Sequence, residues 1–232
     1  MKKKEFNFHN IIWYMILFSI LGLIIETVYG YVSTGILESR KGLILGPFCP
    51  IYGIGAAFFI VVLSDYKESK VKLFIMGAIV GTIFEYICSY ILQVVYGSMF
   101  WDYSYTTYQI NGRISLTYTV FWGILAVLLI KYIKPQFDKV IDKILSKPWD
   151  KIITAFLILD IALTILGVTV YMNRAEMKYN NEQINENVLD KIFNDNIMSF
   201  IFPNLRFTDE VGNSIMVRDM INKVTIQQNI HS

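Results

Sequence analysis

The sequence is short of charged residues, cysteine and histidine, and each shortage excludes a class of protein. Charged side chains make up 17% and apolar ones 54% of the 232 residues, against about 25% and 45–50% in a typical soluble domain, which argues against a soluble enzyme. The formal net charge of +2 is too small to predict nucleic-acid binding. Two cysteines cannot form a disulfide framework. The two histidines, His9 and His231, lie near the termini, so we expect neither a histidine-based catalytic site nor a metal cage.

Long apolar runs take the place of these residues. A transmembrane helix needs about 20 mostly apolar residues, and five segments meet or approach this length: residues 11–32, 47–63, 71–96, 114–133 and 152–172. The second segment is short, and we expect it to extend back through Gly46. The sequence therefore predicts an all-α, polytopic membrane helical bundle of about five transmembrane helices.

The basic residues predict how the chain is oriented in the membrane. With the N-terminus in the cytoplasm, twelve of the 21 Lys and Arg residues fall on the cytoplasmic side, and the short outer loops hold only Arg40, Lys41 and Arg113. Five spans then place the tail, residues 173–232, outside, where we expect it to pack as a small helical cap. Aromatic residues from Tyr96 to Tyr108, Phe100 and Tyr103 among them, crowd the second outer loop as an interfacial belt would. We predict a multi-pass protein of the cell membrane with an extracytoplasmic C-terminus.

Residues 135–150 predict an amphipathic helix on the cytoplasmic surface. Apolar side chains recur at helical spacing among Lys and Asp residues: Phe137, Val140, Ile141, Ile144 and Leu145. We favour a connector on the membrane surface over a docking helix for a partner such as an ATPase. The predicted organisation is a four-span domain (1–134), this connector (135–150), a fifth transmembrane helix (151–172) and the tail (173–232).

The first four spans carry an internal repeat. Residues 22–31 align without gaps on residues 81–90, and Glu26 falls on Glu85. Residues 42–60 similarly align on residues 112–130. We expect a duplicated helical hairpin whose two copies are parallel and related by an axis along the membrane normal.

Two acidic residues, Glu26 and Glu85, lie within predicted spans. An acid in hydrocarbon costs about 2.5–3.5 kcal/mol and normally faces protein or water. Each shares an i, i+4 ridge with glycines, Gly22 and Gly30 in one span and Gly77 and Gly81 in the other, so both should point into the bundle. We expect the repeat axis to bring the two acids together.

Two carboxylates that face each other need compensation. A shared proton, a bound cation or the cations Arg40, Lys41 and Arg113 could supply it. The alternative is a structural role, with Tyr29, Tyr86 or Tyr90 as hydrogen-bond partners. Asp160 in the fifth span is a third acid, which Thr164, one turn on, could satisfy.

The start of the second span is unusual. Pro47 and Pro50 flank Phe48 and Cys49, with Gly42 and Gly46 before them. Residues 42–53 therefore predict either a re-entrant segment that lines a cavity or a simple helix cap with Pro in its first turn.

These motifs resemble the bacterial ABC-transporter type IV permease family, also called CmpB-like, over about residues 11–135. The most specific run is Gly46-Pro47-Phe48-Cys49-Pro50-Ile51-Tyr52-Gly53; the others are Gly22-x-x-x-Glu26, Glu85-Tyr86, Trp101-Asp102-Tyr103-Ser104, Asn111-Gly112-Arg113 and Phe121-Trp122-Gly123. Lys41-Gly42 departs from the expected Arg-Gly, which keeps the charge but loses bidentate geometry. The resemblance implies a bacterial inner-membrane permease and supplies no substrate.

The preferred interpretation is an integral membrane permease or transporter component of unknown substrate. Its outward-facing polar cleft would take a cation, a proton or a small cationic solute, and the candidate binding residues are Glu26, Glu85, Arg113, Asp102, Tyr52, Cys49 and Lys41. The alternative is a non-transporting accessory, sensor or envelope-assembly protein. We expect no enzyme, because no nucleophile is paired with a base, and no cofactor or bound metal. The sequence has no G-x-x-x-x-G-K-[ST] loop, so ATP hydrolysis would need a separate subunit, and five spans are few for a pore, which suggests a homo-oligomer.

Overall fold

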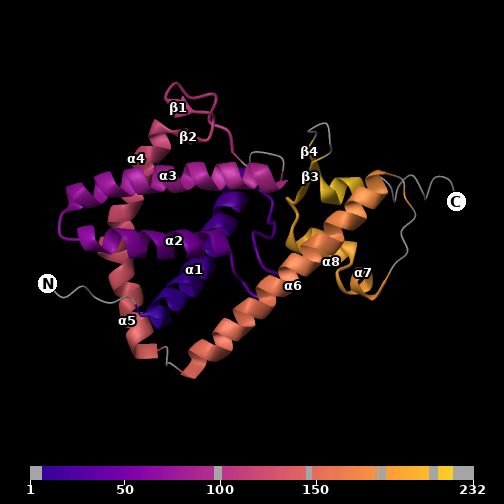
Figure 1. Ribbon diagram of the computed structural model, residues 1–232, viewed down its shortest axis with the longest axis horizontal. Coiled ribbons are helices and arrows are strands. Elements are labelled where there is room, and N and C mark those ends of the chain that lie inside the picture. Colours follow the sequence, from indigo (N-terminus) through magenta and orange to yellow (C-terminus); the bar gives the residue numbers. More distant parts are fainter. Residues whose placement is uncertain are drawn as a thin grey trace. The chain divides into compact units, whose positions relative to one another are not determined.

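The computed structural model describes residues 7–96, 101–144, 148–180, 182, 187–208 and 214–221, which are mainly helical (Figure 1). Phe100, Leu145 and His231 lie outside these residues. Within them, four helical segments are long and apolar enough to cross a membrane: α1 (Phe8–Thr34), α3 (Lys70–Tyr96), the continuous helix from Leu116 to Lys143, and α6 (Pro148–Tyr179). A shorter apolar helix, α2 (Pro50–Leu63), precedes a 3-10 turn at Ser64–Tyr66. The predicted all-α membrane helical bundle is confirmed.

The helix that starts at Leu116 has three parts. These are α4 (Leu116–Leu128), a π-helical turn (Leu129–Ile133) and α5 (Lys134–Ile144). Ser115 caps α4 because its side chain accepts a hydrogen bond from the backbone N–H of Tyr118. Just before this cap, β1 (Gln109–Ile110) and β2 (Ile114–Ser115) form an antiparallel hairpin. Its tip has positive φ angles at Asn111 (52°) and Gly112 (68°), which Asn and Gly tolerate best.

The chain divides into two compact units. The first comprises residues 1–19 and 50–154, and the second comprises residues 20–49 and 155–232. Long helices α1 and α6 each contribute a part to both units.

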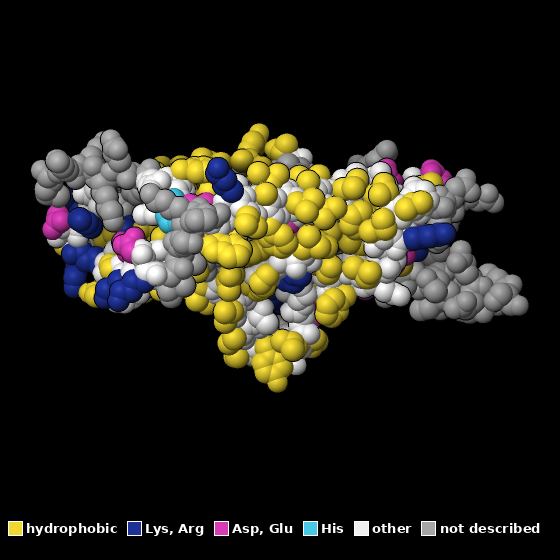
Figure 2. Space-filling model, turned by 90° about the horizontal axis from the view of Figure 1, so that it is seen from below, with side chains coloured by type: hydrophobic (Ala, Val, Ile, Leu, Met, Phe, Trp, Pro, Cys, Tyr) yellow, Lys and Arg dark blue, Asp and Glu magenta, His cyan; other side chains and the backbone are white. Residues whose placement is uncertain are grey.

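In the first unit, small residues bring α3 close to α4. A Cβ atom on Gly81 would lie 2.5 Å from the Cβ of Trp122, and one on Gly123 would lie 2.9 Å from the backbone oxygen of Phe74. The opposite side of α3 carries an exposed isoleucine stripe with i, i+4 spacing: Ile75, Ile79, Ile83 and Ile87. Exposed hydrophobic side chains are widespread on the helices (Figure 2). A helix with one close-packed ridge and one exposed apolar stripe is typical of a lipid-facing membrane helix.

The predicted amphipathic helix corresponds to α5, and its apolar face packs on the first half of α1. Phe137 stacks on Phe18 with ring centroids 4.5 Å apart, and Ile141 is 1% exposed. Tyr14 donates a hydrogen bond to Asp138. Phe137 and Ile141 are thus packed within the chain, whereas Val140 is 37% exposed, and the choice between a connector and a docking helix stays a prediction.

In the second unit, the C-terminal residues pack on the end of α6. They form α7 (Val188–Ile192), α8 (Asp195–Ile201) and an antiparallel pair, β3 (Arg206–Thr208) and β4 (Ser214–Met216). Phe193, Met198 and Val217 share a hydrophobic core with Tyr171 and Ala175 of α6. The sequence predicted a helical cap here and did not predict the strands.

A buried arginine joins this C-terminal segment to α6. Arg174 is 5% exposed, and its guanidinium pairs with Asp190 at 2.9 Å and with Asp195 at 2.7 Å. Lys178 also contacts Asp195 at 2.9 Å. Because two carboxylates surround the guanidinium, its buried charge is neutralised.

Helix α2 begins at Pro50, so the expected extension back through Gly46 is wrong. Residues 36–49 are non-helical. Proline fits the first position of a helix, where its missing N–H is not needed, and it disfavours helical backbone at the residue before it. Pro50 therefore sets the boundary.

Candidate functional site

Glu85 is a buried acid on the α3 face that packs against α4. It is 6% exposed and continues the ridge of Gly77 and Gly81, as the i, i+4 spacing predicts. Its Oε2 accepts a hydrogen bond from the Trp122 indole N–H at 2.9 Å, and its Oε1 accepts one from the Tyr103 hydroxyl at 3.0 Å. The inward orientation of Glu85 was predicted, but these two partners were not.

Tyr103 reaches Glu85 from the loop between α3 and α4. Its ring is 8% exposed and stacks on Tyr118 with centroids 4.5 Å apart. Burial and the nearby Glu85 carboxylate raise the pKa of Tyr103, so the phenol keeps its proton and donates a hydrogen bond to Glu85. Assigning Tyr103 to an interfacial belt was therefore wrong, whereas Tyr105 and Tyr108 are 80% and 71% exposed, as the belt requires.

Arg113, at the hairpin tip, binds the next two turns of the same α3 ridge. Its guanidinium donates to Ser89 Oγ at 3.1 Å and to the Gln93 side chain. The rings of Tyr86 and Tyr90 lie 5.8 and 5.6 Å from the guanidinium carbon. Arg113 thus contacts the ridge beyond Glu85, and both tyrosines that were expected beside the acid flank the arginine instead.

The Trp101-Asp102-Tyr103-Ser104 motif builds the loop that holds these side chains. Asp102 is exposed, and its Oδ1 accepts hydrogen bonds from the Ser104 N–H at 2.8 Å and from the Ser104 hydroxyl at 2.5 Å. These bonds lower the pKa of Asp102. The Trp101 indole donates to the backbone oxygen of Arg113 at 2.9 Å, and the Tyr103 N–H donates to that of Gly112 at 2.8 Å. Asp102 therefore shapes the loop in which Arg113 and Tyr103 are placed.

Asp160 anchors a non-helical segment in the second unit. It is 0% exposed, and its two carboxylate oxygens accept hydrogen bonds from the backbone N–H groups of Leu45 and Gly46, each at 2.8 Å. Contrary to the sequence-based expectation, Thr164 does not donate a hydrogen bond to this carboxylate. Its hydroxyl donates to the backbone oxygen of Asp160 at 2.7 Å and accepts from the N–H of Ile44 at 3.0 Å.

Residues 44–46 therefore lie against the inner part of an apolar helix long enough to span the membrane, Trp149–Tyr179. Non-helical backbone at membrane depth is tolerated only where protein or water satisfies its polar groups. Asp160 and Thr164 accept hydrogen bonds from the three consecutive N–H groups of residues 44–46, which favours the re-entrant alternative for these residues. The start of α2 at Pro50 fits the other alternative, a helix cap with Pro in the first turn. Lys41 closes the segment, since its ammonium donates to the Ile44 backbone oxygen at 2.9 Å.

Glu26 is half-buried on the part of α1 that belongs to the second unit. Its carboxylate interacts electrostatically with the thiol of Cys49. One turn further on, the Arg40 side chain passes over Gly30, where an added Cβ would lie 2.9 Å from Nη2. Glu26 and Cys49 are thus brought together with a cation one helical turn away.

The seven predicted site residues fall into two groups. Glu85, Arg113 and Asp102 lie in or beside the loop between α3 and α4 of the first unit, without direct hydrogen bonds to one another among those described. The exposed Tyr52 is on α2 of the same unit, while Glu26, Cys49 and Lys41 belong to the second unit. The approach of Glu26 to Glu85 stays a prediction. Among the described residues, no cluster of three or more His, Cys, Asp or Glu side chains could hold a metal ion.

Comparison with known proteins gives one match. The family model described as "Putative ABC-transporter type IV" matches residues 13–166, which include α2 to α5 and both acids of the repeat. No curated protein and no solved structure matches the chain. The match covers more than half of the sequence, and the chain belongs to the ABC-transporter type IV family.

Proposed function

We propose that this multi-pass membrane protein is the permease component of a transport complex and that Glu85 is the centre of its binding site for a proton or a small cation. The family and the apolar helices support a membrane-embedded transporter component. The chain contains no P-loop motif, so the proposed complex includes a separate ATPase subunit. A second copy of the chain would supply further helices to the pathway.

The observation that carries the proposal is the environment of the Glu85 carboxylate. Both oxygens accept hydrogen bonds, and both donors, Trp122 and Tyr103, are neutral. Within the described residues no cation forms an ion pair with Glu85. A buried carboxylate without a neutralising partner is costly, and a proton or a cation from solution would remove that cost.

The two donors differ in how readily a guest could replace them. Trp122 belongs to a membrane helix and packs against Gly81, so its indole is fixed. Tyr103 comes from a loop, so its hydroxyl is the donor that a guest would displace. The candidate route to Glu85 therefore passes the loop that Asp102 and Arg113 shape.

A non-transporting role is the second candidate, and the same hydrogen bonds favour it. Glu85 joins α3, α4 and the intervening loop through its two oxygens. In that case the acid would only fix the packing of these elements. The two candidates predict different behaviour for Glu85→Gln, which keeps the size of the side chain and removes its charge.

The test is a cation screen by thermal unfolding of the purified full-length protein. Na⁺, K⁺, tetramethylammonium and a pH series are compared for the wild type, Glu85→Gln and Glu68→Gln, an exposed acid that serves as the charge-matched control. A cation at a hundred times its Kd should stabilise the wild type and Glu68→Gln by about 2.7 kcal/mol, but not Glu85→Gln. Equal responses of all three proteins to every cation and pH would refute a binding role, and loss of the folded state in Glu85→Gln alone would favour the packing role.

Glu26→Gln tests whether the second acid belongs to the same site. If the repeat brings the two acids together, this variant should insert and fold normally but lose the same cation response as Glu85→Gln. A wild-type response in Glu26→Gln would confine the site to Glu85.

A further inference from the structure

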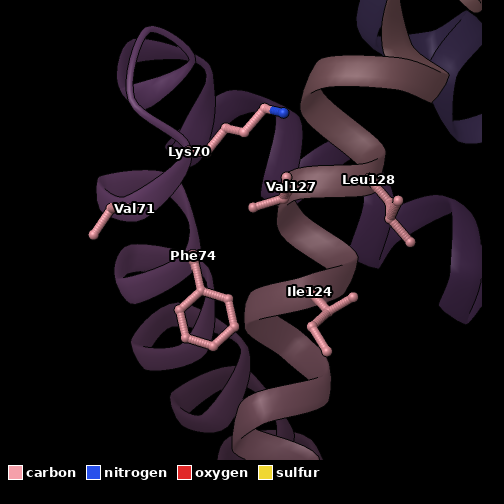
Figure 3. Close-up of a pocket in the computed structure, with 6 residues that line it drawn as sticks. All are labelled: Lys70, Val71, Phe74, Ile124, Val127 and Leu128. Atoms are coloured by element: carbon pink, nitrogen blue, oxygen red, sulfur yellow. The ribbon is translucent and has the colours of Figure 1, made fainter.

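The first unit has an apolar groove with a cation at one end. It lies between α3 and α4, has a volume of about 350 Å³ and is lined by Lys70, Val71, Phe74, Ile124, Val127 and Leu128. Figure 3 shows that Lys70 extends from α3 toward α4, and Val127 from α4 toward α3. Every other lining side chain is apolar. The groove therefore combines an apolar lining with a single polar end.

A second lysine lies near this end of the groove. The ammonium of Lys70 is 5.7 Å from the centre of the Tyr132 ring, and Lys131 also interacts electrostatically with Tyr132. Tyr132 and Lys131 belong to the π-helical turn between α4 and α5. Lys131 lies four residues after Val127 on the groove side of the helix, and Tyr132 of the same turn contacts Lys70 at the start of α3, so one lysine from each helix lies near this end of the groove.

These two charges are not neutralised within the protein. Among the described residues, neither Lys70 nor Lys131 forms an ion pair, whereas Lys134 is paired with Asp138 at 2.7 Å. The acids that precede Lys70 in the sequence, Asp65 and Glu68, are exposed in the turn before α3. The end of the groove is thus open to a negatively charged partner.

We propose that this groove binds one anionic phospholipid, with an acyl chain along Phe74, Ile124 and Val127 and the headgroup phosphate at Lys70 and Lys131. Lysines that follow the membrane ends of helices attract anionic lipids, and basic pockets between transmembrane helices bind their headgroups. The apolar lining suits a hydrocarbon chain and offers nothing to a soluble anion. An anionic phospholipid matches both parts of the groove, whereas a zwitterionic lipid matches only the apolar part.

The test is lipid titration of the full-length protein in detergent micelles, followed by the thermal unfolding midpoint. Phosphatidylglycerol and phosphatidylcholine with identical acyl chains are compared. Phosphatidylglycerol should raise the midpoint of the wild type at lower concentration than phosphatidylcholine does. In Lys70→Gln the half-saturating concentration of phosphatidylglycerol should rise about fivefold, with no change for phosphatidylcholine.

Lys72→Gln is the matched control, because Lys72 is exposed on the same turn of α3 and does not line the groove. It should respond as the wild type does. Val127→Phe should fill the groove and abolish the response to both lipids, and its midpoint without lipid shows whether it is folded. If Val127→Phe does not fold, the comparison of Lys70→Gln with Lys72→Gln alone decides whether phosphatidylglycerol binds at Lys70.

Three results would overturn the proposal. Equal responses of the wild type to the two lipids would show that the headgroup charge is not recognised. Equal losses in Lys70→Gln and Lys72→Gln would show general attraction to a basic surface. An equal midpoint shift with inorganic phosphate at the same phosphate concentration would show that the apolar groove takes no part.

Discussion

Replacing Asp160 with Asn should release the non-helical segment that precedes α2. The carboxylate accepts hydrogen bonds from the N–H groups of Leu45 and Gly46, each at 2.8 Å, in a site that is 0% exposed. Asn has one acceptor oxygen, and its amide nitrogen would meet the second N–H donor with another donor. One backbone N–H group is therefore left unsatisfied, and the remaining bond loses its charge assistance.

The magnitude follows from these two losses. An unsatisfied buried donor costs about 1–3 kcal/mol, and a hydrogen bond to a charged group stabilises more than a neutral one. We expect Asp160→Asn to lower the free energy of opening of residues 44–46 by about 2–3 kcal/mol. Because 1.4 kcal/mol corresponds to tenfold, the segment should open roughly 30 to 150 times more often.

Alkylation of Cys49 by a maleimide measures this opening. Cys49 is half-buried just beyond the anchored residues, and Cys88 on α3, the other cysteine, is replaced by Ala in every protein compared. The Cys49 labelling rate should rise roughly 30- to 150-fold in Asp160→Asn. Thr164→Val removes the acceptor for the Ile44 N–H and the hydroxyl that donates to the backbone oxygen of Asp160, but it leaves the Asp160 carboxylate in place. It should raise the Cys49 labelling rate about fivefold, as expected for one lost neutral hydrogen bond of about 1 kcal/mol on the segment.

A Cys49 labelling rate in Asp160→Asn within twofold of the background protein would refute this reasoning. The same conclusion would follow if Thr164→Val were labelled faster than Asp160→Asn, because the carboxylate would then not be the main anchor. Full labelling with loss of the thermal transition would instead show global unfolding.

Two further predictions concern the C-terminal segment. Arg174→Gln should destabilise the protein by about 3–5 kcal/mol in thermal or denaturant unfolding, because it removes one partner of a buried ion pair. Lys178→Gln, which removes the second cation on Asp195, should cost less than 1 kcal/mol. Equal effects of the two substitutions would show that burial of the Arg174 ion pairs does not matter for stability. Hydrogen bonding to Arg218 holds the pKa of Glu38 below its usual range. The pair therefore stabilises the folded protein at pH values above the pKa of glutamate in the unfolded chain, and this stabilisation is lost as the pH falls through the pKa of Glu38 in the folded protein. Midpoints measured from pH 3 to 7 should therefore fall less steeply on the acid side in Glu38→Gln than in the wild type, and identical pH profiles would show that the pair contributes nothing.

Local patterns in the sequence were enough to predict the helices and the direction of Glu85. The apolar runs predicted the helices because backbone hydrogen bonds in a membrane must be satisfied within each segment. The spacing of Gly77, Gly81 and Glu85 fixed their common face. Both inferences depend on residues close together in the chain.

The partners of the acids could not be predicted, because they depend on contacts between distant residues. Glu85 accepts a hydrogen bond from Trp122, 37 residues away in the sequence, and Asp160 accepts one from Gly46, 114 residues away. No periodicity links such positions. For Asp160, helical spacing points to Thr164 and not to distant N–H groups, but the Thr164 hydroxyl donates to the backbone oxygen of Asp160 instead of to its carboxylate.

The π-helical turn at Leu129–Ile133 sets the rotation of α5 relative to α4. Such a turn corresponds to one residue inserted into an α-helix, and each residue rotates a helix by about 100°. Removing a single residue here would give an uninterrupted helix in which Phe137 no longer faces Phe18. The length of this five-residue stretch therefore decides which face of α5 meets α1, and deleting one of its residues should destabilise the protein more than a conservative substitution in it.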